Sequence, residues 1–189
     1  MTEQELLVDC LRRLNRLGIA YMLTGSMASN FWGIPRTTHA LDFVVQFPPE
    51  AAARIAREFD DGFFIDEPAI HAAFAPSHMF NAIDQRSAFK VDFWMLRPDA
   101  FERSMFDRRF RQTLFGEVAF IPTAEDIILH KLYWHFLTPS ERQLGDAAGI
   151  FAVQAEDLDR DYLRRWGSVL GVGETLDDLF AGKIRPKGT

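Results

Sequence analysis

The segment from Gly25 to Val45 constrains the fold of this chain more than any other. A short apolar strand, predicted at 20–23, leads into it, and a tight turn and a short helix follow. A loop then leads to a second strand at 41–47, whose long apolar run is typical of a strand buried on both faces. We therefore expect a sheet with helices packed against it.

Two polar features of this segment suggest a ligand. Gly25 and Ser26 form the turn before the helix, where unpaired N–H groups and a partial positive charge favour a phosphate. Asp42 is the lone carboxylate of the following strand, and a carboxylate near bound phosphate suggests a metal ion between them. Turns and aspartates of these kinds are also common without a ligand, so the composite site is a hypothesis.

Length and composition favour one domain, with or without a helical extension. The chain has 189 residues, of which 48% are hydrophobic, enough to bury a substantial core. Its net charge of −6 argues against a non-specific nucleic-acid coat but leaves room for a local basic groove. The single cysteine, Cys10, excludes an intrachain disulfide and is predicted to be buried. Residues 1–5 lack the start of a signal peptide and no run is of membrane-spanning length, so we expect a cytoplasmic protein without membrane contact.

Hydrophobic periodicity predicts the remaining elements. Helices are expected at 4–17, 49–59, 68–74, 98–106, 124–137, 139–153, 161–170 and 175–180, strands at 63–65, 80–84 and 88–96, and a hairpin over 108–121. The fold class is thus α/β (α+β), with a mixed sheet flanked by helices. We expect an α/β core over 1–121, a small helical part over 122–189 packed on it, and a frayed tail at 182–189.

Helix caps are predicted at the start of two C-terminal helices. Thr123 with Asp126 fits a capping box, in which the threonine hydroxyl accepts a backbone N–H three residues later. Thr138 with Glu141 fits the same pattern, with Pro139 in the first helical position.

Asp92 lies in the middle of the strand predicted at 88–96. Alternation along this strand puts Lys90, Asp92 and Trp94 on one face and apolar residues on the other. A buried carboxylate costs several kcal/mol unless it is paired or metal-bound, so Asp92 needs a partner. A salt bridge to an arginine and a functional role fit the pattern about equally well.

Charged residues also interrupt the apolar helices of the C-terminal part. Lys131 lies within the densest apolar stretch, and lysine is rarely buried without a partner. It therefore either extends to solvent or faces an anion. Arg142 and Asp146 follow one helix later, four residues apart on one face, where they either pair with each other or line a site.

Taken in order, these residues resemble the active-site signature of the nucleotidyltransferase fold of the polymerase beta superfamily. That signature has a Gly-Ser or Gly-Gly turn, two aspartates one residue apart on the next strand, and a third aspartate on a later strand. The matching pieces are Gly25-Ser26, Arg36-Thr37-Thr38-His39-Ala40-Leu41-Asp42 and Val91-Asp92-Phe93. The chain is most similar to AbiEii-type toxins of type IV toxin–antitoxin systems and to minimal nucleotidyltransferases. The resemblance extends over 20–148, since 122–132 and the Arg142–Asp146 pair match downstream segments of these proteins.

The resemblance implies a Mg²⁺-dependent or Mn²⁺-dependent enzyme that moves a nucleoside monophosphate from an NTP to an acceptor hydroxyl. It implies that Asp42 and Asp92 are catalytic carboxylates and metal ligands, and that Gly25 and Ser26 hold the β- and γ-phosphates. The further nucleotide-binding positions that it implies are Arg36, Thr38, Lys131, Arg142 and Asp146, with Lys131 also counted as catalytic.

Ala40 departs from the signature, because the first aspartate of the pair is expected there. A methyl group cannot ligate a metal, so turnover should fall by several orders of magnitude. Three explanations compete: an engineered inactive variant, a natural pseudoenzyme that binds nucleotide, or replacement of the ligand by a neighbour such as His39 or Asp84. We favour the first, because every other element of the signature is present.

The sequence therefore predicts a nucleotidyltransferase weakened by Ala40, with a catalytically inactive regulatory or antitoxin-like nucleotide-binding module as the alternative. Its acceptor is a tRNA, a protein side chain or a small molecule such as an aminoglycoside. A protein that only binds RNA should have a basic stripe, and this chain has only a modest group of arginines, so tRNA is expected as an acceptor and not as the sole ligand. The group comprises Arg103, Arg108, Arg109 and Arg111. A cognate antitoxin and either a monomer or a homodimer are consistent with this prediction.

Overall fold

The computed structural model describes residues 2–186. Contacts between residues divide the chain into two compact units. The first unit consists of Met1–Gly25 and Thr38–Ile121, and the second of Ser26–Thr37 and Pro122–Thr189. The frayed tail predicted at 182–189 lies partly outside the described residues, and residues 182–186 have no regular structure.

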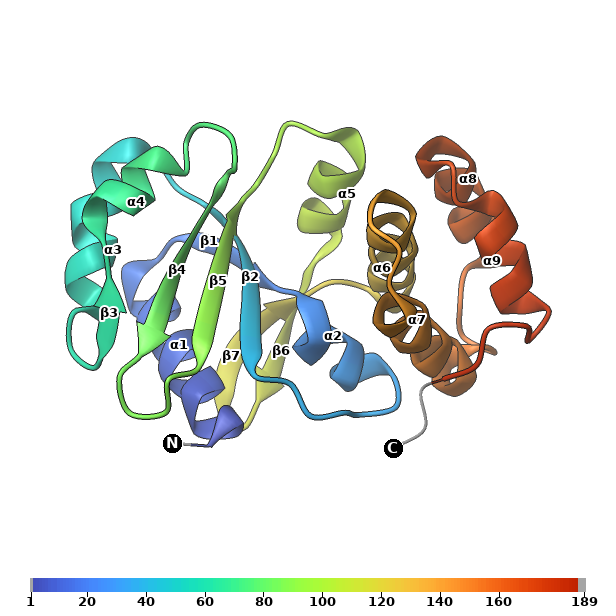
Figure 1. Ribbon diagram of the computed structural model, residues 1–189, viewed down its shortest axis with the longest axis horizontal. Helices are drawn as coiled ribbons and strands as arrows, with labels where there is room; N and C mark the ends of the chain where they lie inside the picture. Colours follow the sequence, from blue (N-terminus) through green and yellow to red (C-terminus); the bar gives the residue numbers. More distant parts are fainter. Residues whose placement is uncertain (1, 187–189) are drawn as a thin grey trace. The chain divides into compact units, whose positions relative to one another are not determined.

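A five-stranded mixed sheet forms the centre of the first unit (Figure 1). In spatial order its strands are β1 (Ala20–Leu23), β2 (Ala40–Gln46), β5 (Lys90–Met95), β4 (Met79–Asp84) and β3 (Phe63–Ile65). Only the central pair, β2 and β5, is parallel. A separate two-stranded ribbon joins β6 (Phe110–Leu114) to β7 (Glu117–Ile121). The predicted α/β class, the strands and the hairpin over 108–121 are confirmed.

The helices of the first unit bury the apolar faces that periodicity predicts. They are α1 (Glu3–Leu17), the 3₁₀ turn η1 (Pro49–Ala51), α3 (Ala52–Phe59), α4 (Glu67–Ala72) and α5 (Ala100–Arg108). Cys10 is fully buried in α1, as predicted, and burial raises the pKa of its thiol. Helix α5 begins two residues later than expected, because the Asp99 side chain caps it by accepting from the N–H groups of Phe101 and Glu102.

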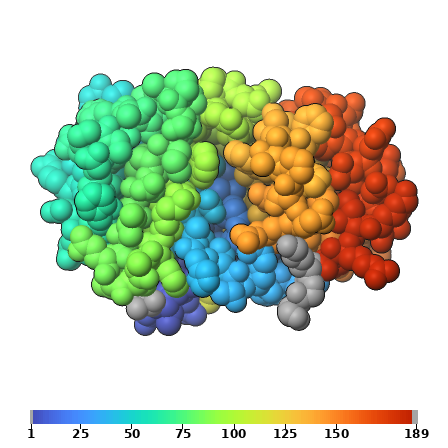
Figure 2. Space-filling model, in the orientation of Figure 1, coloured from blue at the N-terminus to red at the C-terminus, as the bar shows by residue number. Residues whose placement is uncertain are grey.

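Helices α3 and α4 contact each other and the edge of the sheet at β3 and β4. Their residues form one continuous surface of the first unit, coloured cyan to green in Figure 2. The opposite strand of the sheet, β1, contacts β7. Beneath α3, the rings of Phe59, Phe80 and Phe43 all pack against Phe93 of β5. This aromatic core fixes which face of β2 and β5 points inward.

The second unit is helical. It contains α6 (Ala124–Leu137), α7 (Glu141–Gln154), α8 (Arg160–Leu170) and α9 (Gly173–Phe180), together with α2 (Gly25–Trp32) from Ser26 onward. Gly33 lies so close to α7 that an added Cβ would be 2.7 Å from the backbone nitrogen of Ile150. Trp32 donates to the Pro122 carbonyl oxygen and accepts from Gln154. These contacts explain why the short segment 26–37 groups with helices that follow it by about a hundred residues. No helix among residues 2–186 is long and apolar enough to cross a membrane.

One predicted helix cap is confirmed and one is wrong. Thr123 caps α6, accepting from the N–H of Asp126 at 3.2 Å. Thr138 instead ends α6, and Ser140 precedes α7 without a side-chain cap. The physical reason is that the N–H of Ser140 donates to His135 Nδ1 at 2.9 Å, which ties this connection back to α6.

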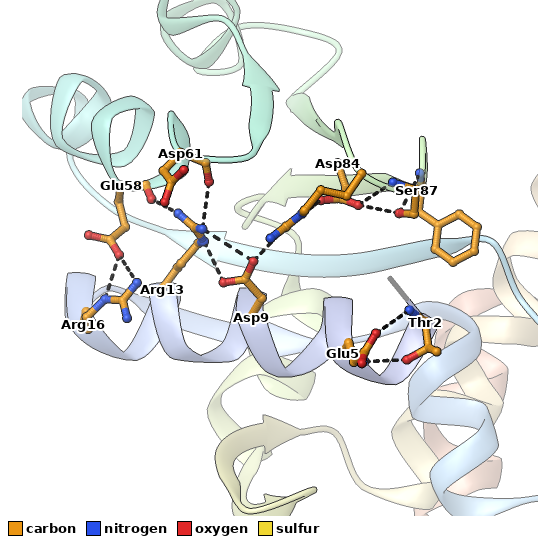
Figure 3. Close-up of polar contacts among 11 residues, drawn as sticks. Thr2, Glu5, Asp9, Arg13, Arg16, Glu58, Asp61, Asp84 and Ser87 are labelled. Atoms are coloured by element: carbon orange, nitrogen blue, oxygen red, sulfur yellow. Dashed lines mark hydrogen bonds and ion pairs between the residues drawn. The ribbon is translucent and has the colours of Figure 1, made fainter.

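A charge network joins α1 to the turn between β4 and β5 (Figure 3). Asp84 is fully buried and accepts from Arg86 Nε at 2.6 Å and from the N–H of Ser87 at 2.8 Å. Arg86 also pairs with Asp9 of α1 at 2.9 Å, and Asp9 pairs with Arg13 at 3.0 Å. Both carboxylate oxygens of Asp84 are thus engaged, so Asp84 does not replace the ligand that Ala40 lacks.

Replacing Asp84 by asparagine is expected to destabilise the protein by about 2 kcal/mol at pH 7, the contribution of charged hydrogen bonds to a buried carboxylate. Burial opposes the charge, but hydrogen bonds from Ser87 and Arg86 outweigh it and hold the pKa of Asp84 below its ordinary value. This stabilisation is therefore complete above about pH 4, the unfolded pKa, and is lost as the pH falls through the lower folded pKa. Urea unfolding at pH 7 and in acid measures the difference.

The matched control is Glu67→Gln, since Glu67 is half-exposed in a loose pair with His71 at 3.7 Å. We expect this variant to change the free energy of unfolding by less than about 0.5 kcal/mol. An equal loss in both variants, or a gap between wild type and Asp84→Asn that widens in acid, would contradict the assignment.

Candidate functional site

A patch of four side chains lies on one face of the two central strands of the first unit. Strands β2 and β5 are parallel, with Ala40 opposite Lys90 and Asp42 opposite Asp92. Since residues two apart on a strand point to the same side, these four side chains share a face. The neighbouring positions Phe43 and Phe93 point to the other face, where their rings stack at 5.8 Å. We call Ala40, Asp42, Lys90 and Asp92 the carboxylate patch.

The register brings the two predicted carboxylates together. Neighbouring strands lie about 4.8 Å apart, so Asp42 and Asp92 leave the sheet side by side. The stacked phenylalanines make this arrangement stable, because a one-residue slip of either strand would turn its aspartate into the core. Two carboxylates that the sequence separates by 50 positions thus share one small surface.

Gly25 lies directly against Asp42. Its φ of +63° is in the left-handed region, and a Cβ added there would be 2.2 Å from Asp42 Oδ2. The preceding residue, Thr24, donates its N–H to the Asp42 carbonyl oxygen at 2.8 Å. Only glycine fits both the backbone conformation and this close approach. The backbone at Gly25 therefore lies against the Asp42 carboxylate.

Asp92 has Lys90 as its partner, so the arginine salt bridge, one of the two alternatives for Asp92, is not observed. Lys90 Nζ lies 2.9 Å from Asp92 Oδ2, while the other oxygen, Oδ1, is buried without a hydrogen-bond partner among residues 2–186. Asp92 itself is only 6% exposed. A buried oxygen without a partner costs free energy, so a ligand at this atom would stabilise it.

The donor set of the carboxylate patch fits one divalent ion and not two. Within residues 2–186, no three His, Cys, Asp or Glu side chains are grouped so that they could hold a metal. Mg²⁺ is often held by one or two carboxylates, with water and substrate phosphates completing its shell. Asp42 and Asp92 provide two carboxylates, and Oδ1 of Asp92 has no hydrogen-bond partner among residues 2–186. Ala40 offers no donor for a second ion.

The Thr38 hydroxyl is used locally. Thr38 is 8% exposed, and its Oγ1 lies 3.2 Å from the carbonyl oxygen and 3.4 Å from the nitrogen of Ala40. It thereby fixes the loop just before β2. Nearby, His39 packs its ring against Phe89 at 5.5 Å.

The second unit contains a cluster of opposite charges around one carboxylate. Asp146 of α7 accepts from Arg36 Nε at 2.7 Å and Nη2 at 2.9 Å, and from Lys131 Nζ at 2.9 Å. Arg36 also donates to Ser26 Oγ at 2.5 Å. We call Ser26, Arg36, Lys131 and Asp146 the basic cluster. Of the two alternatives predicted for Asp146, pairing with Arg142 is not observed, and Arg142 is exposed.

The local fold holds the basic cluster in place. The amide of Asn30 bonds both backbone polar groups of Arg36, accepting from its nitrogen at 3.0 Å and donating to its oxygen at 2.7 Å. Lys131 is 4% exposed, and its ammonium is held by Asp146 at 2.9 Å. Burial opposes the charge of Asp146, but Arg36 and Lys131 outweigh it and keep its pKa below the ordinary value. The cluster carries two cations and one anion, which leaves it a net positive charge.

Two features of these sites were missed from the sequence. The only sign of the Lys90–Asp92 ion pair in the sequence was that both residues lie on one face of a strand. No sequence pattern indicated that Asn30 binds the backbone of Arg36. The predicted group of four arginines is weaker than expected, because Arg109 is partly buried and donates to backbone carbonyl oxygens of Tyr21 and Phe106.

Comparison with known proteins gives the fold a name. No family model matches the sequence, and no curated protein matches it. Among solved structures, an antigenic nucleotidyltransferase-like protein from Paracoccidioides brasiliensis is 15% identical, with a TM-score of 0.59 over 98% of this chain and 94% of that one. The antibiotic-resistance factor ANT(2″)-Ia is 13% identical in its solution structure, with a TM-score of 0.58 over 96% of this chain and 94% of that one. Its crystal structure with adenylyl-2″-tobramycin is 12% identical, with a TM-score of 0.59 over 90% and 97%. The mixed sheet, its flanking helices and these similarities together show that the chain has the nucleotidyltransferase fold.

Proposed function

We propose that this protein binds a nucleoside triphosphate and belongs to the proteins that transfer a nucleoside monophosphate to an acceptor hydroxyl with release of pyrophosphate. The observation that carries the proposal is the pairing of Asp42 with Asp92 across the central strands, with Gly25 packed against Asp42. The nucleotidyltransferase fold of the chain supports the same class of reaction by analogy.

In the first unit, Asp42 and Asp92 are the residues that would hold Mg²⁺ or Mn²⁺ when such an ion binds. When bound, such an ion neutralises phosphate charge and lowers the pKa of an attacking hydroxyl. The chain's own part is to hold the two carboxylates in register and, at Gly25, to keep the backbone close to Asp42. Thr38 supports this arrangement by fixing the loop before Ala40.

In the second unit, the basic cluster is the proposed phosphate-binding site. Arg36 and Lys131 are the cations, Ser26 adds a hydroxyl and the N-terminal turn of α2, and Asp146 positions both cations. Arg142 lies one turn before Asp146 on α7 and is exposed, so it is free to contact a phosphate at the surface. Charge and geometry within the unit support this proposal.

Ala40 and Lys90 favour a second candidate, a nucleotide-binding regulatory or antitoxin-like module without catalysis. The patch lacks the donor that an aspartate at position 40 would give, and an ammonium already occupies one oxygen of Asp92. Transfer by the unaltered chain is therefore expected to be slow or absent, whether Ala40 is engineered or natural.

The acceptor hydroxyl has three candidate sources. ANT(2″)-Ia was solved with adenylyl-2″-tobramycin, which makes an aminoglycoside one candidate acceptor beside tRNA and a protein side chain. The similarity of the signature to AbiEii-type toxins makes a cognate antitoxin a candidate partner of a monomer or homodimer. Total RNA, total protein and tobramycin are suitable test acceptors.

Equilibrium dialysis with ATP, GTP, CTP and UTP tests the proposal. With Mg²⁺ present, we expect at least one NTP to bind with a dissociation constant below about 1 mM. Arg36→Ala should weaken this binding, whereas Asp178→Asn, at an exposed surface pair with Lys183, should not. Failure of all four NTPs to bind the folded wild type would refute the proposed function.

A further inference from the structure

The carboxylate patch carries a cation of its own. Asp42 and Asp92 share their face of the sheet with the ammonium of Lys90 and the methyl group of Ala40. The ammonium sits 2.9 Å from Asp92 Oδ2, a normal distance for a charged hydrogen bond. A divalent ion at Asp92 would therefore meet a positive charge already in place.

Geometry holds Lys90 in this position. It is two residues from Asp92 on β5, so both side chains leave the same face of the strand. Its cross-strand neighbour is Ala40, which offers no competing carboxylate. The side chain of Asp92 is 9% exposed and that of Lys90 is 49% exposed, so the lysine reaches from solvent to a buried charge. Without it, Asp92 would be a buried carboxylate with no partner for either oxygen among residues 2–186.

We propose that Lys90 is an internal cation that takes the place of a divalent ion at Asp92. The unaltered chain then binds divalent ions weakly and holds a nucleoside triphosphate without needing one. This inference rests on the proposed function for its nucleotide part, but its metal part stands on the patch alone. Lys90 acts here on the patch itself, since its ammonium offsets part of the negative charge of Asp42 and Asp92.

Titration with Mn²⁺ alone, followed by electron paramagnetic resonance of the free ion, tests the metal part. We expect Lys90→Ala to bind Mn²⁺ at least about five-fold more tightly than wild type, the factor that two unit charges about 4 Å apart give even in bulk water. Lys90→Arg keeps the charge and should resemble wild type. Lys183→Ala, which removes a lysine from an exposed pair, is the matched control and should have no effect. Equal Mn²⁺ affinity in wild type and Lys90→Ala would overturn the inference, provided circular dichroism shows both folded.

Dialysis of the four NTPs with EDTA and with Mg²⁺ tests the nucleotide part. Wild type should bind its NTP within about two-fold of the same affinity in both conditions, because Lys90 supplies the charge. Lys90→Ala should bind at least about five-fold more weakly in EDTA than in Mg²⁺. Loss of wild-type binding in EDTA would overturn the inference while leaving the proposed function intact. If no NTP binds wild type at all, the proposed function fails, and the Mn²⁺ titration alone decides the role of Lys90.

Discussion

Replacing Ala40 by aspartate is expected to raise nucleotidyl transfer by at least about 10³-fold over the unaltered chain. The new carboxylate would share a face of β2 with Asp42, two residues away, and give the patch its third donor. It would also stand opposite Lys90, and would compete with Asp92 for that ammonium. Both effects favour a metal-loaded site. The measurement is label transfer from each α-labelled NTP in the presence of Mg²⁺ and total RNA, total protein or tobramycin.

Ala40→Asn is the matched control for this gain, because it adds nearly the same volume without the charge. We expect it to remain as inactive as the unaltered chain. Transfer by neither variant, with NTP bound to both, would rule out the enzyme and leave the regulatory nucleotide-binding module. Equal activation by asparagine and aspartate would show that shape, and not charge, is missing at position 40.

Replacing Asp146 by alanine is expected to destabilise the protein by about 3 kcal/mol at pH 7, because it removes the carboxylate between two cations. The side chains of Asp146 and Lys131 are only 7% and 5% exposed, so water compensates little for the loss. The pKa of Asp146 is held low, so its contribution is present above about pH 4 and is lost as the pH falls through the folded pKa. Urea unfolding of both proteins at pH 7 and in acid measures this.

Asp178→Ala removes a carboxylate from an ion pair of the same type at the surface, with side chains 48% and 69% exposed. We expect this variant to lower the free energy of unfolding by less than about 1 kcal/mol. The comparison therefore shows how much of the loss in Asp146→Ala comes from the burial of its ion pair. If Asp146→Ala cost no more than this control, the basic cluster would not be a structural unit, and its proposed role in holding Arg36 and Lys131 would fall with it.

Much of the fold follows from local patterns. The apolar periodicity of α1 and α6 and the left-handed glycine at position 18 define helices whose ends agree with the structure to within one residue. The strands β1 and β3 match their predicted ranges. Errors occur where a tertiary contact overrides a local signal. The Thr138 cap is not formed, because the N–H of Ser140 donates to His135 of the preceding helix.

The candidate sites were predictable only in part, for a related reason. Glycine at position 25 and the aspartates at 42 and 92 can be found from the sequence because their chemistry stands out from apolar surroundings. Their partners depend on strand register and on chain crossings that no local pattern encodes. Along its own helix, the expected partner of Asp146 was Arg142, four residues earlier. Asp146 pairs instead with Arg36, which lies 110 residues earlier in the chain.

The most direct test of the account is to locate the metal. Crystals of the Ala40→Asp variant, grown with Mn²⁺ and a non-hydrolysable NTP, should give an anomalous manganese peak about 2.1 Å from carboxylate oxygens of both Asp42 and Asp92. That result would make the carboxylate patch the metal site of a nucleotidyltransferase. Bound nucleotide with no manganese at either aspartate, or manganese bound elsewhere in the chain, would contradict the central claim.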